Sequence, residues 1–212
     1  MAINLVKLPT KKQDLYLRVA KGHFATSHSH INYFIDVTIQ KTRLSEARAV
    51  AQELVSYYTH NTIVDTILCL DGTEVIGSCM ASELTRDGYT NMNAHQTIYI
   101  VTPEHTTGSQ LLFRENTAPM IAGKHVLILA ASVTTGYTAQ AAVEAVNYYG
   151  GQVVGISSIF STVEECAGHE VVSIFDPNDL GDYESYDSRS CPWCKAGKKI
   201  DALVNSFGYS SL

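Results

Sequence analysis

Residues 126–138 read VLILAASVTTGYT, and this stretch decides the fold expected for the chain. The four large apolar residues at 126–129 indicate a strand buried on both faces, as parallel strands are. A turn rich in hydroxyl side chains follows around Gly136, and an alanine-rich segment with helical spacing runs on to Gly151. Because N–H groups point outward at the start of a helix and the helix dipole favours negative charge, we expect this turn to bind an anion, above all a phosphate.

The amino-acid composition indicates the class of protein and argues against several kinds of partner. The 212 residues are 45% hydrophobic and 17% charged, which predicts one globular domain of the larger kind. The net charge of −6, without a basic stripe, argues against a nucleic acid or an anionic membrane as partner. No apolar run is of membrane-spanning length, and the N-terminus lacks the apolar region of a signal peptide. Five cysteines, an odd number, favour a reducing cytoplasm.

Strand-like and helix-like segments alternate along the chain. This alternation predicts βαβ units with right-handed crossovers and a mainly parallel sheet, with ligands beyond the carboxyl ends of its strands. Two short helices are also expected, at 14–20 and 202–207. The main strands are expected at 31–39, 63–70, 97–101, 126–129, 152–160 and 171–175. The main helices are expected at 44–58 and 75–84, and an alanine-rich helix is expected after Thr138, ending at Tyr149.

The opening stretch resembles the signature of the type I phosphoribosyltransferases: an apolar run, two acidic residues, two further residues and Thr-Thr-Gly-x-Thr. The resemblance implies a loop that holds the 5'-phosphate of phosphoribosyl pyrophosphate (PRPP), which is bound together with Mg²⁺. The acidic pair, which holds the ribose hydroxyls in that family, is replaced by Ala130 and Ala131, which cannot accept hydrogen bonds. The phosphate-binding residues implied are Ser132, Val133, Thr134, Thr135, Gly136, Tyr137 and Thr138.

The N-terminal part resembles the hood of orotate phosphoribosyltransferases. Residues 22–24 (GHF) and 30–36 (HINYFID) carry the resemblance, whereas the Ser-Gly-basic turn of the family is replaced by SHS at 27–29. The resemblance implies that the base lies near Phe24 and Tyr33. It also implies a hood at 1–40, an α/β core at 41–180 with a central parallel five-stranded sheet flanked by helices, and a tail at 181–212 packed on the core or the hood.

A second turn follows the strand expected at 63–70. Its residues are Asp71, Gly72, Thr73 and Glu74, and in the family this position is the pyrophosphate loop. The alternative is an ordinary tight turn in which the aspartate and the threonine cap the next helix. Both interpretations stay open on the sequence alone.

Residues 102–123 form a long polar segment of the kind that often serves as a lid. The family closes a flexible loop from this place, and in orotate enzymes the loop carries a catalytic lysine. This segment has no lysine, and its ionisable candidates include His105 and Arg114, of which Arg114 is the candidate for contacting a pyrophosphate. The alternative is a solvated loop or a small β-hairpin.

The tail contains Cys-Pro-Trp-Cys at 191–194, similar to a tail of some bacterial orotate phosphoribosyltransferases. Cys191 and Cys194 are half of a zinc site, because structural zinc takes four ligands. Candidates for the other half are Cys166, His28 or His30, or the same cysteine pair of a second subunit. The alternatives are a turn with two free thiols and a redox pair.

The resemblance implies transfer of ribose 5-phosphate from PRPP to a nucleobase such as orotate, in a cytoplasmic homodimer. No catalytic residue can be named. The first alternative is a catalytically impaired relative that binds a phosphorylated sugar or nucleotide as a sensor or an assembly partner. The second alternative is a different enzyme that acts on a phosphate ester on the same scaffold.

Overall fold

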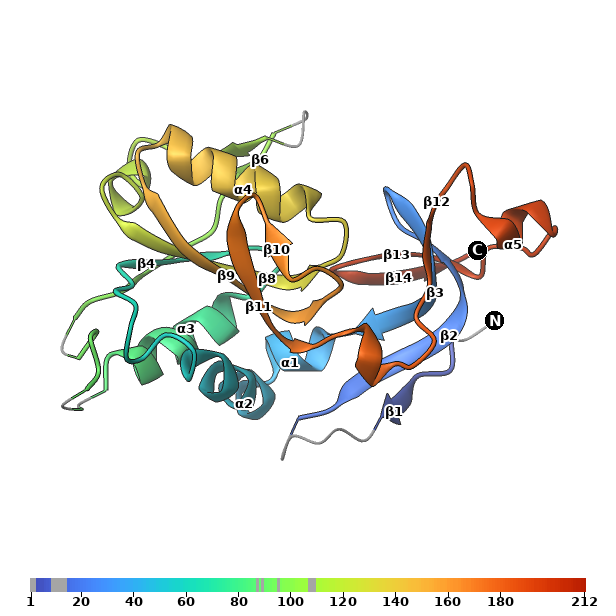
Figure 1. The fold of residues 1–212 in the computed structure, drawn as a ribbon, viewed down its shortest axis with the longest axis horizontal. Helices are drawn as coiled ribbons and strands as arrows, with labels where there is room; N and C mark the ends of the chain where they lie inside the picture. The colour runs from blue at the N-terminus through green and yellow to red at the C-terminus, as the bar shows by residue number, and fades with distance from the viewer. Residues whose placement is uncertain (1–2, 9–14, 87, 89, 95, 107–109) are drawn as a thin grey trace. The chain divides into compact units, whose positions relative to one another are not determined.

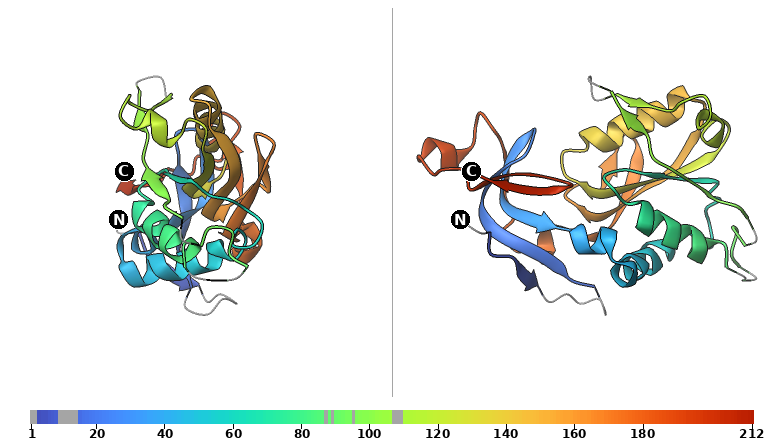
Figure 2. Two further views of the ribbon diagram at one scale, coloured as in Figure 1. Left: turned by 90° about the vertical axis from the view of Figure 1, so that its left-hand side faces the viewer. Right: turned by 180° about the vertical axis from the view of Figure 1, so that it is seen from behind.

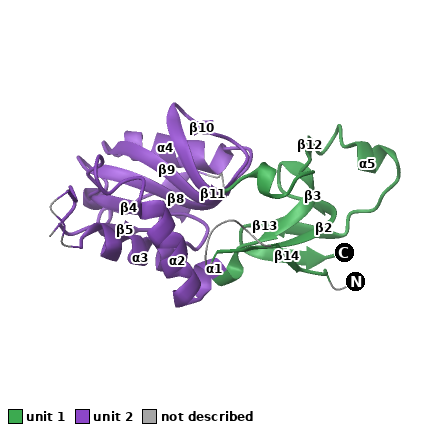
Figure 3. Ribbon diagram, turned by 60° about the horizontal axis from the view of Figure 1, so that its bottom comes forward, with its two compact units in different colours: residues 1–39, 175–212 green, residues 40–174 purple. Residues whose placement is uncertain are grey.

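The computed structural model describes residues 3–8, 15–86, 88, 90–94, 96–106 and 110–212 of the chain. The chain divides into two compact units, which are described separately (Figure 3). Unit 1 combines Met1–Ile39 with Phe175–Leu212, and unit 2 is Gln40–Ile174. The two ends of the chain therefore belong to one unit, and the middle of the chain forms the other.

Unit 2 is an α/β unit built on the expected strand–helix alternation. Its main helices are α2 (Leu44–Val55), α3 (Glu74–Leu84) and α4 (Tyr137–Tyr148). Its strands are β4 (Thr66–Cys69), β5 (Tyr99–Val101), β6 (Glu104–His105), β7 (Leu111–Leu112), β8 (His125–Val133), β9 (Gln152–Ser161), β10 (Glu165–Cys166) and β11 (His169–Phe175).

The central sheet has the strand order β10-β11-β9-β8-β4-β5. Strand β4 pairs in parallel with β5 and β8, and β8 pairs in parallel with β9. The sixth strand, beyond the five expected, arises because the short β10 folds back antiparallel on β11. Helix α4 covers one face of the sheet, and α2 and α3 cover the other (Figures 1 and 2).

The core of unit 2 explains why 126–129 is an unbroken apolar run. Val126, Leu127, Ile128 and Leu129 are all fully buried, because helices cover both faces of the strand. The apolar positions of α4, among them Ala142 and Val146, pack on one face of this sheet. The core therefore holds the end of β8 and the start of α4 in a fixed relation.

Unit 1 is a sheet of order β12-β3-β2-β13-β14, in which β1 also pairs with β2. A cluster of buried apolar residues on these strands includes the rings of Phe24 and Phe34. The elements of this unit are β1 (Val6–Leu8), β2 (Leu17–Ala25), β3 (Ser29–Asp36), η2 (Pro177–Asp179), β12 (Ser185–Asp187), α5 (Pro192–Lys195), β13 (Ala202–Asn205) and β14 (Gly208–Ser211); the short helix α1 (Thr38–Thr42) lies at the boundary between the units.

The two short helices expected at 14–20 and 202–207 are wrong. Residue 14 lies outside the described residues, and the chain from Leu17 onward is strand β2. Residues 202–205 alternate between buried and exposed side chains as β13, which pairs in parallel with β2 and antiparallel with β14. Pairing with neighbours distant in sequence overrides the weak local preference for a helix. Within the described residues, no helix is long and apolar enough to cross a membrane.

Candidate functional site

The turn between β8 and α4 has the geometry of an anion site. Gly136 is the N-cap of α4 and has a left-handed backbone with φ of +78°, which glycine adopts without steric cost. Its carbonyl accepts the first helical hydrogen bond, from the N–H of Gln140 at 2.8 Å. As a glycine, Gly136 has no side chain that could cap this end of the helix. The first N–H groups of an α-helix have no carbonyl partner within the helix, so a helix start of this kind can donate to an external acceptor.

The neighbouring strand holds this turn from behind. The hydroxyl of Thr162 donates to the carbonyl of Thr134 at 2.8 Å, and its N–H donates to the carbonyl of Val133 at 3.0 Å. The thiol of Cys166 donates to the carbonyl of Gly136 at 3.5 Å, and burial raises the pKa of this thiol. The carbonyls of Thr134 and Gly136 are thus bonded to the protein, and these bonds stabilise the turn.

Ala130 and Ala131 are the residues at which the sequence resemblance would place the acidic pair of the type I phosphoribosyltransferases. Their exposed fractions are 2% and 0%, and both lie in β8. Ala130 is part of the apolar core of unit 2. These two positions therefore contribute packing and offer no acceptor to a sugar hydroxyl.

The second turn, at 71–74, joins β4 to α3 with two left-handed residues. Asp71 has φ of +58° and Gly72 has φ of +77°. The fully buried hydroxyl of Thr73 donates to the carbonyls of Leu70 and Leu129, at 2.8 and 3.1 Å. Thr73 is the N-cap by position, but its side chain makes no capping bond. Its hydroxyl ties β4 to β8, which is a structural role.

Sequence reasoning missed Lys41, which reaches this turn from α1. Its Nζ donates to the carbonyl of Asp71 at 2.7 Å, and the side chain is buried. The ammonium supports the unusual backbone of Asp71 and adds positive charge beside the turn. A lysine in a short helix 30 residues earlier carries no sequence signal of such a contact.

The segment at 102–123 begins beside the second turn and forms a small hairpin. The hydroxyl of Thr102 donates to Glu74 Oε1 at 3.1 Å. Strands β6 and β7 then pair antiparallel, and residues 107–109 of the expected lid lie outside the described residues. Arg114 donates from Nε and from a terminal nitrogen to Glu104, and this contact lowers the pKa of the Glu104 carboxyl. His105 is exposed on β6.

The parallel pairing brings the two turns to one edge of the sheet. Strands β4, β5 and β8 run in the same direction, so their carboxyl ends meet there. Residues 71–74, Thr102 and residues 134–138 follow these three strands. The edge thus combines an uncapped helix start, a left-handed turn and the Lys41 ammonium, which together suit a ligand with more than one phosphate.

Phe24 and Tyr33, the residues expected near a base, lie in unit 1. Phe24 is 1% exposed and meets the ring of Phe34 edge-on at 6.2 Å. The hydroxyl of Tyr33 donates to Asp182 Oδ1 at 2.6 Å, and Lys21 pairs with the same carboxylate. Both aromatic side chains thus take part in the packing of unit 1, and their contact with a base stays a prediction.

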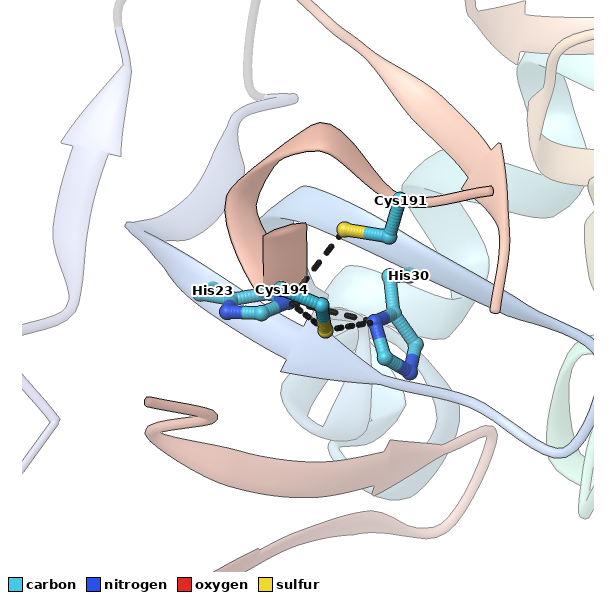
Figure 4. Close-up of side chains that lie close together, drawn as sticks. All are labelled: His23, His30, Cys191 and Cys194. Carbon is cyan, nitrogen blue, oxygen red and sulfur yellow. Dashed lines mark hydrogen bonds between the residues drawn. The ribbon is translucent and has the colours of Figure 1, made fainter. Parts of the chain in front are cut away.

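The two tail cysteines lie against two histidines of the β2–β3 hairpin (Figure 4). His23 comes from β2, His30 from β3, Cys191 precedes α5 and Cys194 lies within it. One ligand atom from each lies within 4.8 Å of the others. His30 was among the expected partners of the cysteines, whereas His23 was missed. Cys166 belongs to unit 2, and the described cluster does not include His28.

The chain is similar to known proteins in its structure but not in its sequence. The sequence matches no protein-family model and no curated protein. The structure, however, is similar to orotate phosphoribosyltransferase of Mycobacterium tuberculosis in complex with Fe(III) dicitrate, with a TM-score of 0.54 and 19% identity over 78% of this chain and 93% of that one. The chain has the fold of the type I phosphoribosyltransferases.

Two further solved structures agree on this phosphoribosyltransferase fold. The same Mycobacterium tuberculosis enzyme in complex with inorganic phosphate gives a TM-score of 0.50 at 19% identity, covering 71% of this chain and 82% of that one. UMP synthase of Leishmania donovani gives 0.54 at 19% identity, covering 76% of this chain and 34% of that one. The βα turn at 134–138 therefore belongs to a phosphoribosyltransferase fold.

Proposed function

We propose that this protein binds PRPP with its 5'-phosphate on residues 134–138 and transfers the phosphoribosyl group to a nucleobase such as orotate. The observation that carries the proposal is the uncapped start of α4 behind left-handed Gly136, at the carboxyl edge of the parallel sheet. A phosphate at this position accepts hydrogen bonds from backbone N–H groups and lies at the positive end of the helix dipole. The phosphoribosyltransferase fold supports the same placement.

The pyrophosphate of PRPP is proposed to lie at residues 71–74. Lys41 adds a positive charge beside this turn through its contact with Asp71. Mg²⁺ takes oxygen ligands, commonly one or two carboxylates together with phosphate oxygens, and Asp71 and Glu74 are the carboxylates of this turn. When bound, Mg²⁺ neutralises charge on the leaving pyrophosphate. The residues of the chain position the substrate and stabilise charge, which accounts for most of the acceleration in such transfers.

One observation favours a second function, which is binding without transfer. Ala130 and Ala131 are buried and offer no acceptor to the ribose hydroxyls. Leaving a desolvated hydroxyl without its partner costs about 1–3 kcal/mol. A protein with the phosphate turn and without these contacts suits a sensor or an assembly partner that recognises a phosphorylated sugar or nucleotide.

A paired binding and turnover experiment tests both functions. PRPP binding is measured by calorimetry with and without Mg²⁺, with ribose as the control that lacks phosphate. Pyrophosphate release is then followed with PRPP and either orotate or a purine base. Binding with base-dependent release supports the transferase, and binding without release supports the second function. If PRPP and inorganic phosphate both fail to bind, both proposals are wrong.

The phosphoribosyltransferase resemblance also leads us to expect a homodimer. Light scattering of the purified protein measures its mass in solution. A monomer at all accessible concentrations would contradict this expectation.

A further inference from the structure

The His/Cys cluster of unit 1 plays no part in the proposed phosphate chemistry. It joins four side chains that come from β2, β3 and the tail around α5. His23, His30 and Cys191 are buried, and Cys194 is exposed. Two thiols and two imidazoles are a common ligand set of structural zinc, and the Cys-x₂-Cys spacing of 191–194 is typical of such sites. We propose that these four residues bind one zinc ion that fastens the C-terminal tail to the β2–β3 hairpin.

The distances within the cluster fit a tetrahedral ion. With zinc–nitrogen bonds of about 2.0–2.1 Å and zinc–sulfur bonds of about 2.3 Å, tetrahedral angles place two nitrogens about 3.3 Å apart and a nitrogen and a sulfur about 3.6 Å apart. His23 Nε2 lies 3.1 Å from His30 Nδ1. Cys191 Sγ and Cys194 Sγ lie 3.6 and 3.7 Å from His23 Nε2, and Cys194 Sγ lies 3.2 Å from His30 Nδ1.

Hydrogen bonding prepares His23 as a metal ligand. Its Nδ1 lies 3.0 Å from the carbonyl of Lys198 and 3.1 Å from that of Lys199. Both neighbours only accept hydrogen bonds, so Nδ1 carries the proton. In the neutral ring, Nε2 then has a lone pair, which faces the centre of the cluster. An imidazole oriented by a backbone carbonyl through its other nitrogen is a recurring feature of zinc sites.

Charge and surroundings also suit the ion. Two thiolates and two neutral imidazoles around Zn²⁺ form a site without net charge, which can be buried without a large penalty. On binding, each thiol releases its proton and each sulfur donates a lone pair to the ion. Trp193 lies edge-on to His23 at 5.3 Å and to Tyr186 at 5.2 Å, and so covers part of the site with aromatic rings.

The position of the cluster explains what the ion does for the fold. Unit 1 consists of Met1–Ile39 and Phe175–Leu212, and units of this small size often depend on a metal or disulfides for stability. Four protein ligands leave no open coordination position, which is typical of a structural rather than a catalytic ion. The ion therefore stabilises the join between chain segments that are more than 160 residues apart.

Metal analysis of the reduced full-length protein tests the proposal. We expect one zinc per chain by mass spectrometry after purification without chelators. After removal of the metal, titration with Co²⁺ should give the visible absorption of tetrahedral cobalt and a near-ultraviolet thiolate charge-transfer band. Cys194→Ser should weaken Co²⁺ binding by more than the roughly 10–100-fold that loss of an outer partner costs. Cys166→Ser and His28→Asn are matched controls and should bind Co²⁺ as the wild type does.

The wild-type measurements do not depend on the folding of any variant. Absence of stoichiometric zinc together with absence of a thiolate–cobalt band in the reduced protein would overturn the proposal. An equal loss of binding in Cys166→Ser would also overturn it, because that thiol lies in unit 2. A metal-free protein that carries a Cys191–Cys194 disulfide would show a redox pair instead. PRPP binding is measured separately, so the two proposals succeed or fail independently.

Discussion

Replacing Gly136 with alanine should separate backbone strain from ligand binding. The residue has φ of +78°, and a left-handed backbone costs a residue with a side chain about 1–2 kcal/mol. An added Cβ would also lie 3.3 Å from Cys166 Sγ, so that the sulfur would have to move by a few tenths of an ångström. We therefore expect Gly136→Ala to lower the free energy of unfolding by about 1–2 kcal/mol.

Gly136→Ala should also weaken the binding of PRPP or inorganic phosphate, in addition to lowering the free energy of unfolding. A tilt of the turn moves the N–H groups that we propose to bind the phosphate, and a hydrogen bond to a charged group contributes about 1.5–3 kcal/mol. Loss of one such bond corresponds to an affinity for PRPP or inorganic phosphate that is roughly 10- to 100-fold weaker. Denaturant unfolding measures the stability, and calorimetry measures the affinity.

Gly150→Ala is the matched control. Gly150 follows the other end of α4 with φ of +77°, and an added Cβ there meets no atom within 4 Å. Gly150→Ala should lower the free energy of unfolding by about as much as Gly136→Ala does. Its affinity for PRPP or inorganic phosphate should equal that of the wild type. Equal affinities of Gly136→Ala and the wild type would refute the placement of the phosphate at residues 134–138.

Three further predictions address individual contacts. Thr73→Val should lower the free energy of unfolding by about 0.5–1.5 kcal/mol, because the carbonyls of Leu70 and Leu129 each lose the hydroxyl donor but keep a backbone N–H donor. Denaturant unfolding measures this loss, and an unchanged stability would contradict the structural role of the hydroxyl. Glu104→Gln removes the charged partner of the exposed Arg114 and should change the free energy of unfolding by less than about 1 kcal/mol. It should also strengthen PRPP binding at low salt, whereas weaker binding would count against a role for Arg114. Burial raises the pKa of Asp65, but hydrogen bonds from the N–H and the ring of His125 outweigh it, so the net pKa is lowered. Asp65 therefore stabilises the fold above its unfolded pKa of about 3.9 and loses this contribution as the pH falls through its lower folded pKa. Asp65→Asn should make the free energy of unfolding less dependent on pH in this acid range. The same pH dependence in the variant and the wild type would contradict the role of Asp65.

The sequence by itself determined the α/β core and the turn at Gly136 between β8 and α4. Both follow from local patterns. A continuous apolar run is typical of a strand that is covered on both faces, and a glycine is favoured where the backbone is left-handed before a helix. The same local signals placed α2, α3 and the second turn at 71–74. The sequence also allowed a small hairpin within 102–123, and the structure shows one.

Only the tertiary structure decided the contacts between distant segments. Strands β2 and β13 are stabilised by pairing with each other, and their sequences carry weak local signals. The contact of Lys41 with Asp71 and the approach of His23 to the tail cysteines likewise depend on strand register and chain path. Local propensity acts over a few residues, whereas these contacts join residues 30 to 171 positions apart. For the turn at 134–138, the structure added the hydrogen bonds of Thr162 and Cys166 to the carbonyls of Thr134 and Gly136.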